Sequence, residues 1–366
     1  MMRGLRDRLD TFWGRGAAAV TVPSMDGALR PNNLLDQAPV PLSIPEPDNL
    51  VDCAGEILFS SAGVVFALAG DAAAGRPVPK YQFDQPIACL AAHESGVLAV
   101  GVSGEIALRG GARDGKSFKQ VGGAPLLCPT ALAFDGPDAL IVCLGSTANP
   151  PQEWKRDLMQ RNASGSVWRI DLATGSATRL ADGLGYPNGV LLVGRDLRIS
   201  EAWRHRVLLV KPGAAPAALL EHLPGYPARM TASADGGSWL CVFAPRRQMV
   251  EFVLREKAYR ERMMREVHPD HWMAPALRSG RSFLEPIQGG AVKHLGISKP
   301  WAPTRSYGLV IRLDVSGSPV VSAHSRADGV RHGVTSCLEF GDRLLVASKG
   351  GGVIASLELA ELDTEL

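Results

Sequence analysis

Histidines carry much of the acid–base and metal chemistry of proteins, so they are the first residues to consider. His332 begins the apolar segment HGVTSCLEF. Because an imidazole titrates near neutral pH, His332 could act as a general base. The alternative is a turn residue that caps a strand. His268 and His271 have a spacing that suits a shared metal on a helix, but the intervening Pro269 favours a surface turn.

The six cysteines occur singly, and no Cys-x-x-Cys pair is present, which argues against a structural zinc site. Most of them lie in apolar runs, where cysteine behaves as a small buried hydrophobic residue. No secretory signal is evident at the N-terminus, so we predict free thiols and a cytoplasmic location. The Gly-x-Ser-x-Gly elbow of α/β-hydrolases and the phosphate-binding P-loop are both missing from the sequence.

The elements that position these residues follow a repeat of a turn and several apolar strands. The copies begin at Pro47, Pro86, Pro129, Pro187, Pro227 and His332. Pro86 follows Pro47 by 39 residues, and Pro227 follows Pro187 by 40. A repeat of about 40–50 residues with several strands is typical of a β-propeller. The sequence therefore predicts an all-β fold, a six-bladed β-propeller, whereas a β-sandwich would leave the repeat unexplained.

Two copies contain insertions, 147–164 in the third and 246–305 in the fifth. Within the longer one, Glu251 to Val267 is rich in strong helix formers and predicts a helix. We expect residues 246–305 to form a lid over the channel mouth or a packing ornament. The domain prediction is an N-terminal arm over 1–44 and a propeller over 45–366.

Composition limits the partners of this chain. The net charge of +2 is too balanced to indicate nucleic-acid binding, and no run approaches the ~18 apolar residues of a membrane span. In the arm, an apolar set at near-helical spacing suggests a short amphipathic helix formed by Leu5, Leu9, Phe12 and Trp13. This helix either docks on its own domain or contacts a membrane surface.

The strand pair GSVWRIDLATGSATRL and the turn GYPNGV resemble the strictosidine synthase-like family, which is related to paraoxonases and regucalcin-type gluconolactonases. The resemblance covers roughly Pro45 to Leu359 and implies a six-bladed propeller. In metal-dependent relatives, a Ca²⁺ or other divalent ion lies at the top of the channel, held by residues at the starts of the innermost strands. Such an ion can polarise an ester or lactone carbonyl.

The resemblance places metal ligands at Asp48 and Asn188, and Thr130 where some relatives have Asn. Ala228 and Arg229 replace the Asp-Asn that relatives commonly carry. The methyl group of Ala228 cannot bind a metal, and the guanidinium of Arg229 repels one by about 4 kcal/mol per unit charge at ~4 Å and an effective dielectric constant of 20. Two alternatives follow. Either Ca²⁺ binds, or Arg229 takes the place of the ion and pairs with Asp48 or an anionic ligand.

Glu201 matches a family position before a loop and an Arg. It either holds Arg204 or Arg206 as a structural carboxylate, or takes part in catalysis. Trp203 lines a pocket or covers the blade. The stretch from His332 to Ser336 lacks the glutamate that strictosidine synthase needs, so we expect no synthase activity.

We predict a hydrolase of a small lactone or ester with a site at the top of the channel. The catalytic candidates are His332 and Glu201, and the metal candidates are Asp48 and Asn188. The candidates for substrate binding are Arg229, Thr130, Trp203 and Thr335. The alternative is a non-catalytic propeller that binds a small anionic ligand or a protein partner, its metal site having decayed.

Overall fold

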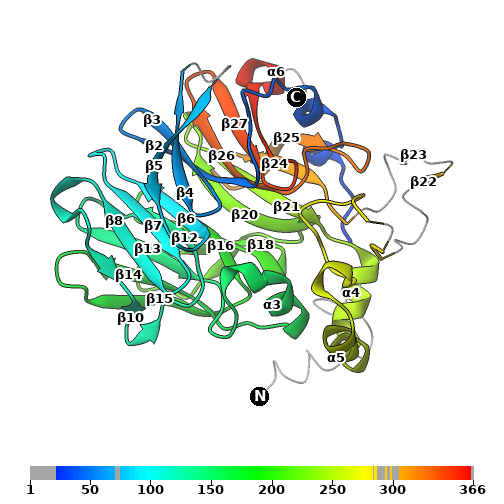
Figure 1. The fold of residues 1–366 in the computed structure, drawn as a ribbon, viewed down its shortest axis with the longest axis horizontal. Coiled ribbons are helices and arrows are strands. Elements are labelled where there is room, and N and C mark those ends of the chain that lie inside the picture. Colours follow the sequence, from blue (N-terminus) through cyan, green and yellow to red (C-terminus); the bar gives the residue numbers. More distant parts are fainter. Residues whose placement is uncertain are drawn as a thin grey trace.

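The computed structural model describes residues 22–70, 75–282, 284–286, 293–294, 297–298 and 305–363. Six four-stranded antiparallel sheets make up the fold, as the repeat predicts (Figure 1). Each sheet packs between two others, so its middle strands bury both faces. β13 (Ala139–Leu144), with the sequence ALIVCL, is buried at every position for this reason.

The first blade comprises β2 (Pro47–Cys53), β3 (Glu56–Ser61), β4 (Val64–Ala69) and β5 (Arg76–Gln82). The second comprises β6 (Ile87–Ala92), β7 (Leu98–Val102), β8 (Glu105–Arg109) and β9 (Ser117–Phe118). The third comprises β12 (Pro129–Phe134), β13, β14 (Gly165–Asp171) and β15 (Ala177–Leu184). The fourth blade comprises β16 (Pro187–Val193), β17 (Asp196–Glu201), β18 (Arg206–Val210) and β19 (Ala217–Leu220). The fifth comprises β20 (Gly225–Ala232), β21 (Ser238–Pro245), β24 (Gly308–Leu313) and β25 (Pro319–Ser325). The sixth comprises β26 (Val334–Phe340), β27 (Arg343–Ser348), β28 (Val353–Glu358) and β1 (Leu42–Ser43).

Two short hairpins, β10–β11 (Gln120–Val121 and Ala124–Pro125) and β22–β23 (Lys293–His294 and Ile297–Ser298), lie outside the blades.

The innermost strands form a closed ring. Each of β2, β6, β12, β16, β20 and β26 contacts the next, and β26 returns to β2. The last blade takes its outer strand from the N-terminal arm, because β1 pairs with β28. The hydrophobic clusters lie between adjacent blades, so the ring is held by the burial of apolar surface around its circumference.

The two insertions emerge at one end of the ring. Both join the second strand of a blade to the third, which in an antiparallel sheet is the end where the first strand begins. The shorter insertion carries η4 (Pro151–Glu153) and α3 (Trp154–Gln160). The longer one carries α4 (Gln248–Arg255), α5 (Lys257–Glu266) and η6 (Pro269–His271), and α5 contacts α3 (Figure 1). We call this end of the ring the top.

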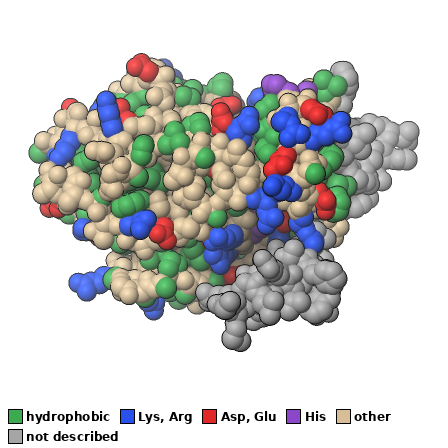
Figure 2. Space-filling view, turned by 90° about the horizontal axis from the view of Figure 1, so that it is seen from below, with side chains coloured by type: hydrophobic (Ala, Val, Ile, Leu, Met, Phe, Trp, Pro, Cys, Tyr) green, Lys and Arg blue, Asp and Glu red, His purple; other side chains and the backbone are tan. Residues whose placement is uncertain are grey.

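The sequence predicts a single helix over Glu251 to Val267. This prediction is wrong in one respect, because the segment forms two helices, α4 and α5. The backbone of Glu256, at φ −80° and ψ 82°, leaves the helical region between α4 and α5. His268 precedes the short 3-10 helix η6 as its N-cap, and His271 is the last residue of that helix, in agreement with the surface-turn interpretation. At the end of the molecule that carries α4 and α5, Lys and Arg side chains gather on the face seen in Figure 2.

The N-terminal arm from residue 22 onwards lies along the outside of the fifth and sixth blades. It forms η2 (Gly27–Leu29), α2 (Leu34–Gln37) and then β1. η2 and α2 contact β25, and the Leu35 side chain is buried in the largest cluster. The predicted amphipathic helix near residues 5–13 lies outside the described residues.

Three shorter helical segments, η3 (Gly111–Arg113), η5 (Ala202–Arg204) and α6 (Leu359–Asp363), complete the secondary structure of the described residues. None of the helices among the described residues has the length and apolar character needed to cross a bilayer. All six cysteines are buried and free, as predicted.

Candidate functional site

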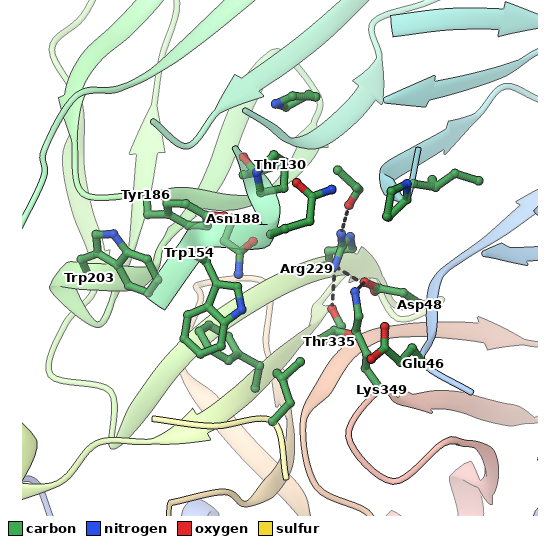
Figure 3. Close-up of a pocket in the computed structure, with 18 residues that line it drawn as sticks. Glu46, Asp48, Thr130, Trp154, Tyr186, Asn188, Trp203, Arg229, Thr335 and Lys349 are labelled. Atoms are coloured by element: carbon green, nitrogen blue, oxygen red, sulfur yellow. Dashed lines mark hydrogen bonds and ion pairs between the residues drawn. The ribbon is translucent and has the colours of Figure 1, made fainter. Parts of the chain in front are cut away.

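A cavity of about 320 Å³ opens at the top of the central channel. Six of the eight predicted site residues line it, namely Asp48, Thr130, Asn188, Trp203, Arg229 and Thr335. In Figure 3, charged side chains occupy one side of this cavity and aromatic rings the other.

A β-bulge in every innermost strand brings these residues together. The pairing with the second strand shifts register between Pro129 and Ala131, and between Pro187 and Gly189. Equivalent shifts occur near the start of the other four innermost strands. A bulge redirects the side chain of its extra residue. In five blades an unpaired position of the bulge is a cavity residue, namely Ala88, Thr130, Asn188, Arg229 or Thr335. In the first blade the cavity residue is Asp48, the last paired residue before the shift.

The charged side of the cavity centres on Asp48, which is 4% exposed. Arg229 Nη1 donates to its Oδ1 at 3.0 Å, and Lys349 Nζ donates to its Oδ2 at 3.1 Å. The backbone N–H of Asn49 also donates to Oδ1. Burial alone would raise the pKa of Asp48, but the positive charges of Arg229 and Lys349 outweigh it and leave this pKa below its usual value. Asp48 is therefore an ionised carboxylate between two cations.

Arg229 closes the channel beneath the cavity. Its guanidinium also donates to the carbonyl oxygens of Ala88 and Thr335, which belong to two other blades. The same side chain borders a second cavity of about 490 Å³ in the lower half of the channel. Arg229 thus separates the top cavity from the opposite mouth.

The opposite side of the cavity is aromatic. The rings of Tyr186 and Trp203 stack with centroids 4.5 Å apart, and Trp154 meets Phe243 edge-on at 5.3 Å. Buried Asp157 of α3 accepts a hydrogen bond from Trp203 Nε1 at 2.8 Å. The helix therefore fixes the orientation of the wall. Flat apolar rings facing a cation pair suit a ligand with an apolar body and a polar or anionic end.

The neutral polar residues have defined partners. Asn188 Nδ2 donates to the Pro227 carbonyl at 3.2 Å, and Thr130 Oγ1 donates to the Cys143 carbonyl at 3.2 Å. These bonds join the third blade internally and the fourth blade to the fifth. They fix both side chains at the cavity wall.

The site does not fit the predicted calcium ion. Both carboxylate oxygens of Asp48 already accept hydrogen bonds from cations, and a divalent ion would add two positive charges beside Arg229 and Lys349. Within the described part of the chain, no three His, Cys, Asp or Glu side chains form a potential metal site. The alternative interpretation, in which Arg229 pairs with Asp48, agrees with this geometry.

His332 and Glu201 do not line the cavity. Burial lowers the pKa of His332, and its two ring nitrogens contact Ser306 Oγ and the Arg326 carbonyl, both at 2.7 Å. An imidazole held in this way has no nitrogen free for a substrate. The geometry therefore does not support His332 as a general base.

Glu201 is fully buried, and its carboxylate accepts hydrogen bonds from Arg204 and Arg206, each at 2.6 Å. It also accepts one from the backbone N–H of Gly185, next to Tyr186. This agrees with the interpretation as a structural carboxylate. Glu201 supports the aromatic wall from behind and does not contact the cavity.

Other cavity residues were not predicted: Glu46, Trp154, Phe243, Leu277 and Lys349. Trp154 comes from the shorter insertion, for which no role was predicted. Leu277 comes from the longer insertion, which was expected to form a lid or a packing ornament. Lys349 lies at the end of a second strand, and its sequence context SKGGG carries no signal of a site. Glu46 precedes the first blade and has a φ of +50°, a backbone conformation that is uncommon for a residue other than glycine.

The fold and this site place the chain among the six-bladed propellers. No protein-family model matches the sequence, and no curated protein matches it significantly. The calcium-binding protein regucalcin from Agrobacterium tumefaciens has a similar structure, with a TM-score of 0.54 and 12% identity over 87% of this chain and 92% of that one. A gluconolactonase from Xanthomonas campestris gives a TM-score of 0.53 and 13% identity over 89% and 88%. These likenesses show the shared fold.

Proposed function

We propose that this protein hydrolyses a lactone or ester bond of a small molecule in the top cavity, and that it does so without a metal ion. The observation that carries the proposal is the Arg229–Asp48–Lys349 group, in which two cations bind Asp48, the residue that the resemblance predicts as a metal ligand. The sequence resembles a family related to paraoxonases and gluconolactonases, and the fold is shared with a gluconolactonase. Both likenesses support hydrolysis of a lactone or ester.

In this proposal Arg229 and Lys349 bind the carbonyl oxygen of the substrate. Preorganised donors stabilise the negative charge that develops on this oxygen when water attacks. Asp48 is a positioning residue, because its carboxylate holds both cations. Its depressed pKa makes it a weak base at neutral pH.

The remaining carboxylate at the cavity is that of exposed Glu46, which we propose as the general base. Glu46 removes a proton from water as the water oxygen bonds to the carbonyl carbon. The acyl C–O bond then breaks, and the proton passes to the departing alkoxide. The products are a hydroxy acid from a lactone, or an acid and an alcohol from an ester.

The test is a proton-release assay on a panel of γ-lactones, δ-lactones and aryl esters. Glu46→Gln is expected to lower kcat about 100-fold, the lower range for loss of a general base. Glu94→Gln, which removes a carboxylate at the other end of the channel, is the matched control and should retain activity. Equal activity of the Glu46→Gln variant and the wild type would contradict the assignment of the base.

Metal independence has its own measurement. Treatment with EDTA is expected to leave turnover unchanged, and elemental analysis of the purified protein should find calcium well below one ion per chain. Stoichiometric calcium that is required for turnover would overturn the proposed role of Arg229.

A second candidate function, non-catalytic binding of a small anionic ligand, is favoured by the saturation of Asp48. With both oxygens bonded to cations, this carboxylate contributes no free base at the channel. If no lactone or ester in the panel turns over while small anions bind in the cavity, the binding function replaces the hydrolase.

A further inference from the structure

Another cavity, of about 360 Å³, adjoins the top cavity and is distinct from the one in the lower half of the channel. We call it the vestibule. The two share Glu46, Trp154, Leu277 and Lys349 among their lining residues, so Trp154 of the aromatic wall and Lys349 of the cation pair border both. A ligand in the cavity can therefore extend into the vestibule past Trp154.

The vestibule has an excess of positive charge. Five cationic side chains line it: Lys155, Arg278, Arg281, Arg305 and Lys349. Three carboxylates accompany them, those of Glu46, Asp270 and Glu285.

Arg305 forms the buried base of the vestibule. Its side chain is 4% exposed, and Nη1 lies 3.7 Å from Glu285 Oε2. Nη2 donates to the Asp270 carbonyl at 2.9 Å, while Nε has no partner among the residues that the structure describes. Burying a guanidinium with a donor unused is costly unless a ligand satisfies it.

The other cations are also incompletely paired. Lys155 Nζ lies 3.9 Å from the carboxylate of Asp270, and its pKa is lowered by burial and by the positive charge of Arg305. Arg278 and Arg281 are exposed and form no ion pair with a carboxylate in the described part of the chain. Two unpaired guanidinium groups at the rim are suited to bidentate binding of an oxyanion.

We infer that the vestibule binds the oxyanion group of an elongated substrate whose apolar body lies against the aromatic wall. The shared chemistry is a carboxylate or phosphate separated from the reacting carbonyl by an apolar spacer. Arg278 and Arg281 bind the anion at the rim, above Arg305. This inference names the substrate class of the proposed hydrolase, but it is tested by binding and does not depend on turnover.

The experiment is calorimetric titration of the full-length protein with three probes that share one apolar body: 4-phenylbutyl phosphate, 4-phenylbutanoate and neutral 4-phenylbutan-1-ol. The wild type is expected to bind at least one anion roughly tenfold more tightly than the alcohol. The two anionic probes distinguish a phosphate site from a carboxylate site.

The test variant is Arg278→Gln/Arg281→Gln, and the matched control is Arg195→Gln/Lys211→Gln, which removes the same charge from an exposed site on the fourth blade. The test variant should lose the preference for the anion, and the control should keep it. Equal binding of alcohol and anions, or an unchanged preference in the test variant, would overturn the inference. Anion binding without hydrolysis of any lactone or ester would leave this inference standing and contradict the proposed function alone.

Discussion

At the scale of single residues, charge balance decides what the site can do. Asp48 is buried beside two cations, and removing its charge leaves Arg229, whose side chain is 16% exposed, without its ion-pair partner. Removing one partner of a buried ion pair lowers the stability of a protein by more than the intact pair raises it, because the remaining charge stays desolvated.

Asp48→Asn is therefore expected to lower the free energy of unfolding by about 3 kcal/mol at pH 7. Because the folded-state pKa of Asp48 lies below its unfolded value of 3.8, the ionised carboxylate stabilises the protein above that pH. This contribution is lost as the pH falls through the folded-state pKa. Urea unfolding at several pH values should show the difference between variant and wild type shrinking below about pH 4. Asp84→Asn, at an exposed position, serves as the control and should show no such difference.

His324 predicts a second pH effect. Burial lowers its pKa from 6.5 to about 3, and its ring contacts Tyr307 and Ser322. Between these pH values the unfolded chain binds a proton that the folded protein does not, so stability falls as the pH falls. From pH 7 to pH 5 the loss is about 2 kcal/mol from this group. His324→Gln should flatten that part of the urea-unfolding profile; an unchanged slope would show that His324 is not responsible.

At the scale of elements, the short helix α3 determines the aromatic wall. Asp157 on this helix accepts hydrogen bonds from Trp203, Asn149 and Asn162. The wall therefore depends on a carboxylate that does not touch the cavity.

Asp157→Ala leaves buried donors unsatisfied, at a cost of about 1–3 kcal/mol each. We expect a lower urea midpoint, a changed near-ultraviolet circular dichroism from the tryptophans, and weaker binding of aromatic probes. Asp182→Ala removes an exposed carboxylate and should change none of these. Wild-type spectra and probe affinity in Asp157→Ala would contradict the role of α3.

At the scale of the whole molecule, the ring is closed by strands from both ends of the chain. β1 pairs with β28, Pro39 accepts a hydrogen bond from the N–H of Ser356, and Gly352 accepts one from Ile44. Leu35, at 1% exposure, anchors the arm that delivers β1.

Leu35→Ala is expected to lower the stability of the ring by about 2–4 kcal/mol, since it leaves a cavity in the core. Hydrogen exchange should speed up first at the amides of Ile44 and Ser356. Val40→Ala, at a position 38% exposed, is the control. Uniform acceleration across all blades would show that the arm does not act as a separate closing element.

Much of the architecture was predictable from the chain alone. A repeat of turn and strands is a local property of the sequence. The six copies correspond to six blades because five blades fold from consecutive residues and the sixth takes three of its four strands from one copy. The placement of Asp48, Thr130, Asn188, Arg229 and Thr335 in one cavity followed from the repeat together with the family resemblance, since equivalent positions of the copies converge on the channel.

Only the tertiary structure decided what these residues do together. Lys349 reaches Asp48 across 301 positions of sequence, and this contact turns a predicted metal ligand into the centre of an ion-pair group. His332 and Glu201 bear chemically capable side chains, yet burial and saturated hydrogen bonds hold them away from the cavity. Local sequence determines strands and turns through their apolar pattern, whereas the charge state and accessibility of a side chain depend on neighbours that only the folded ring brings within a few ångströms.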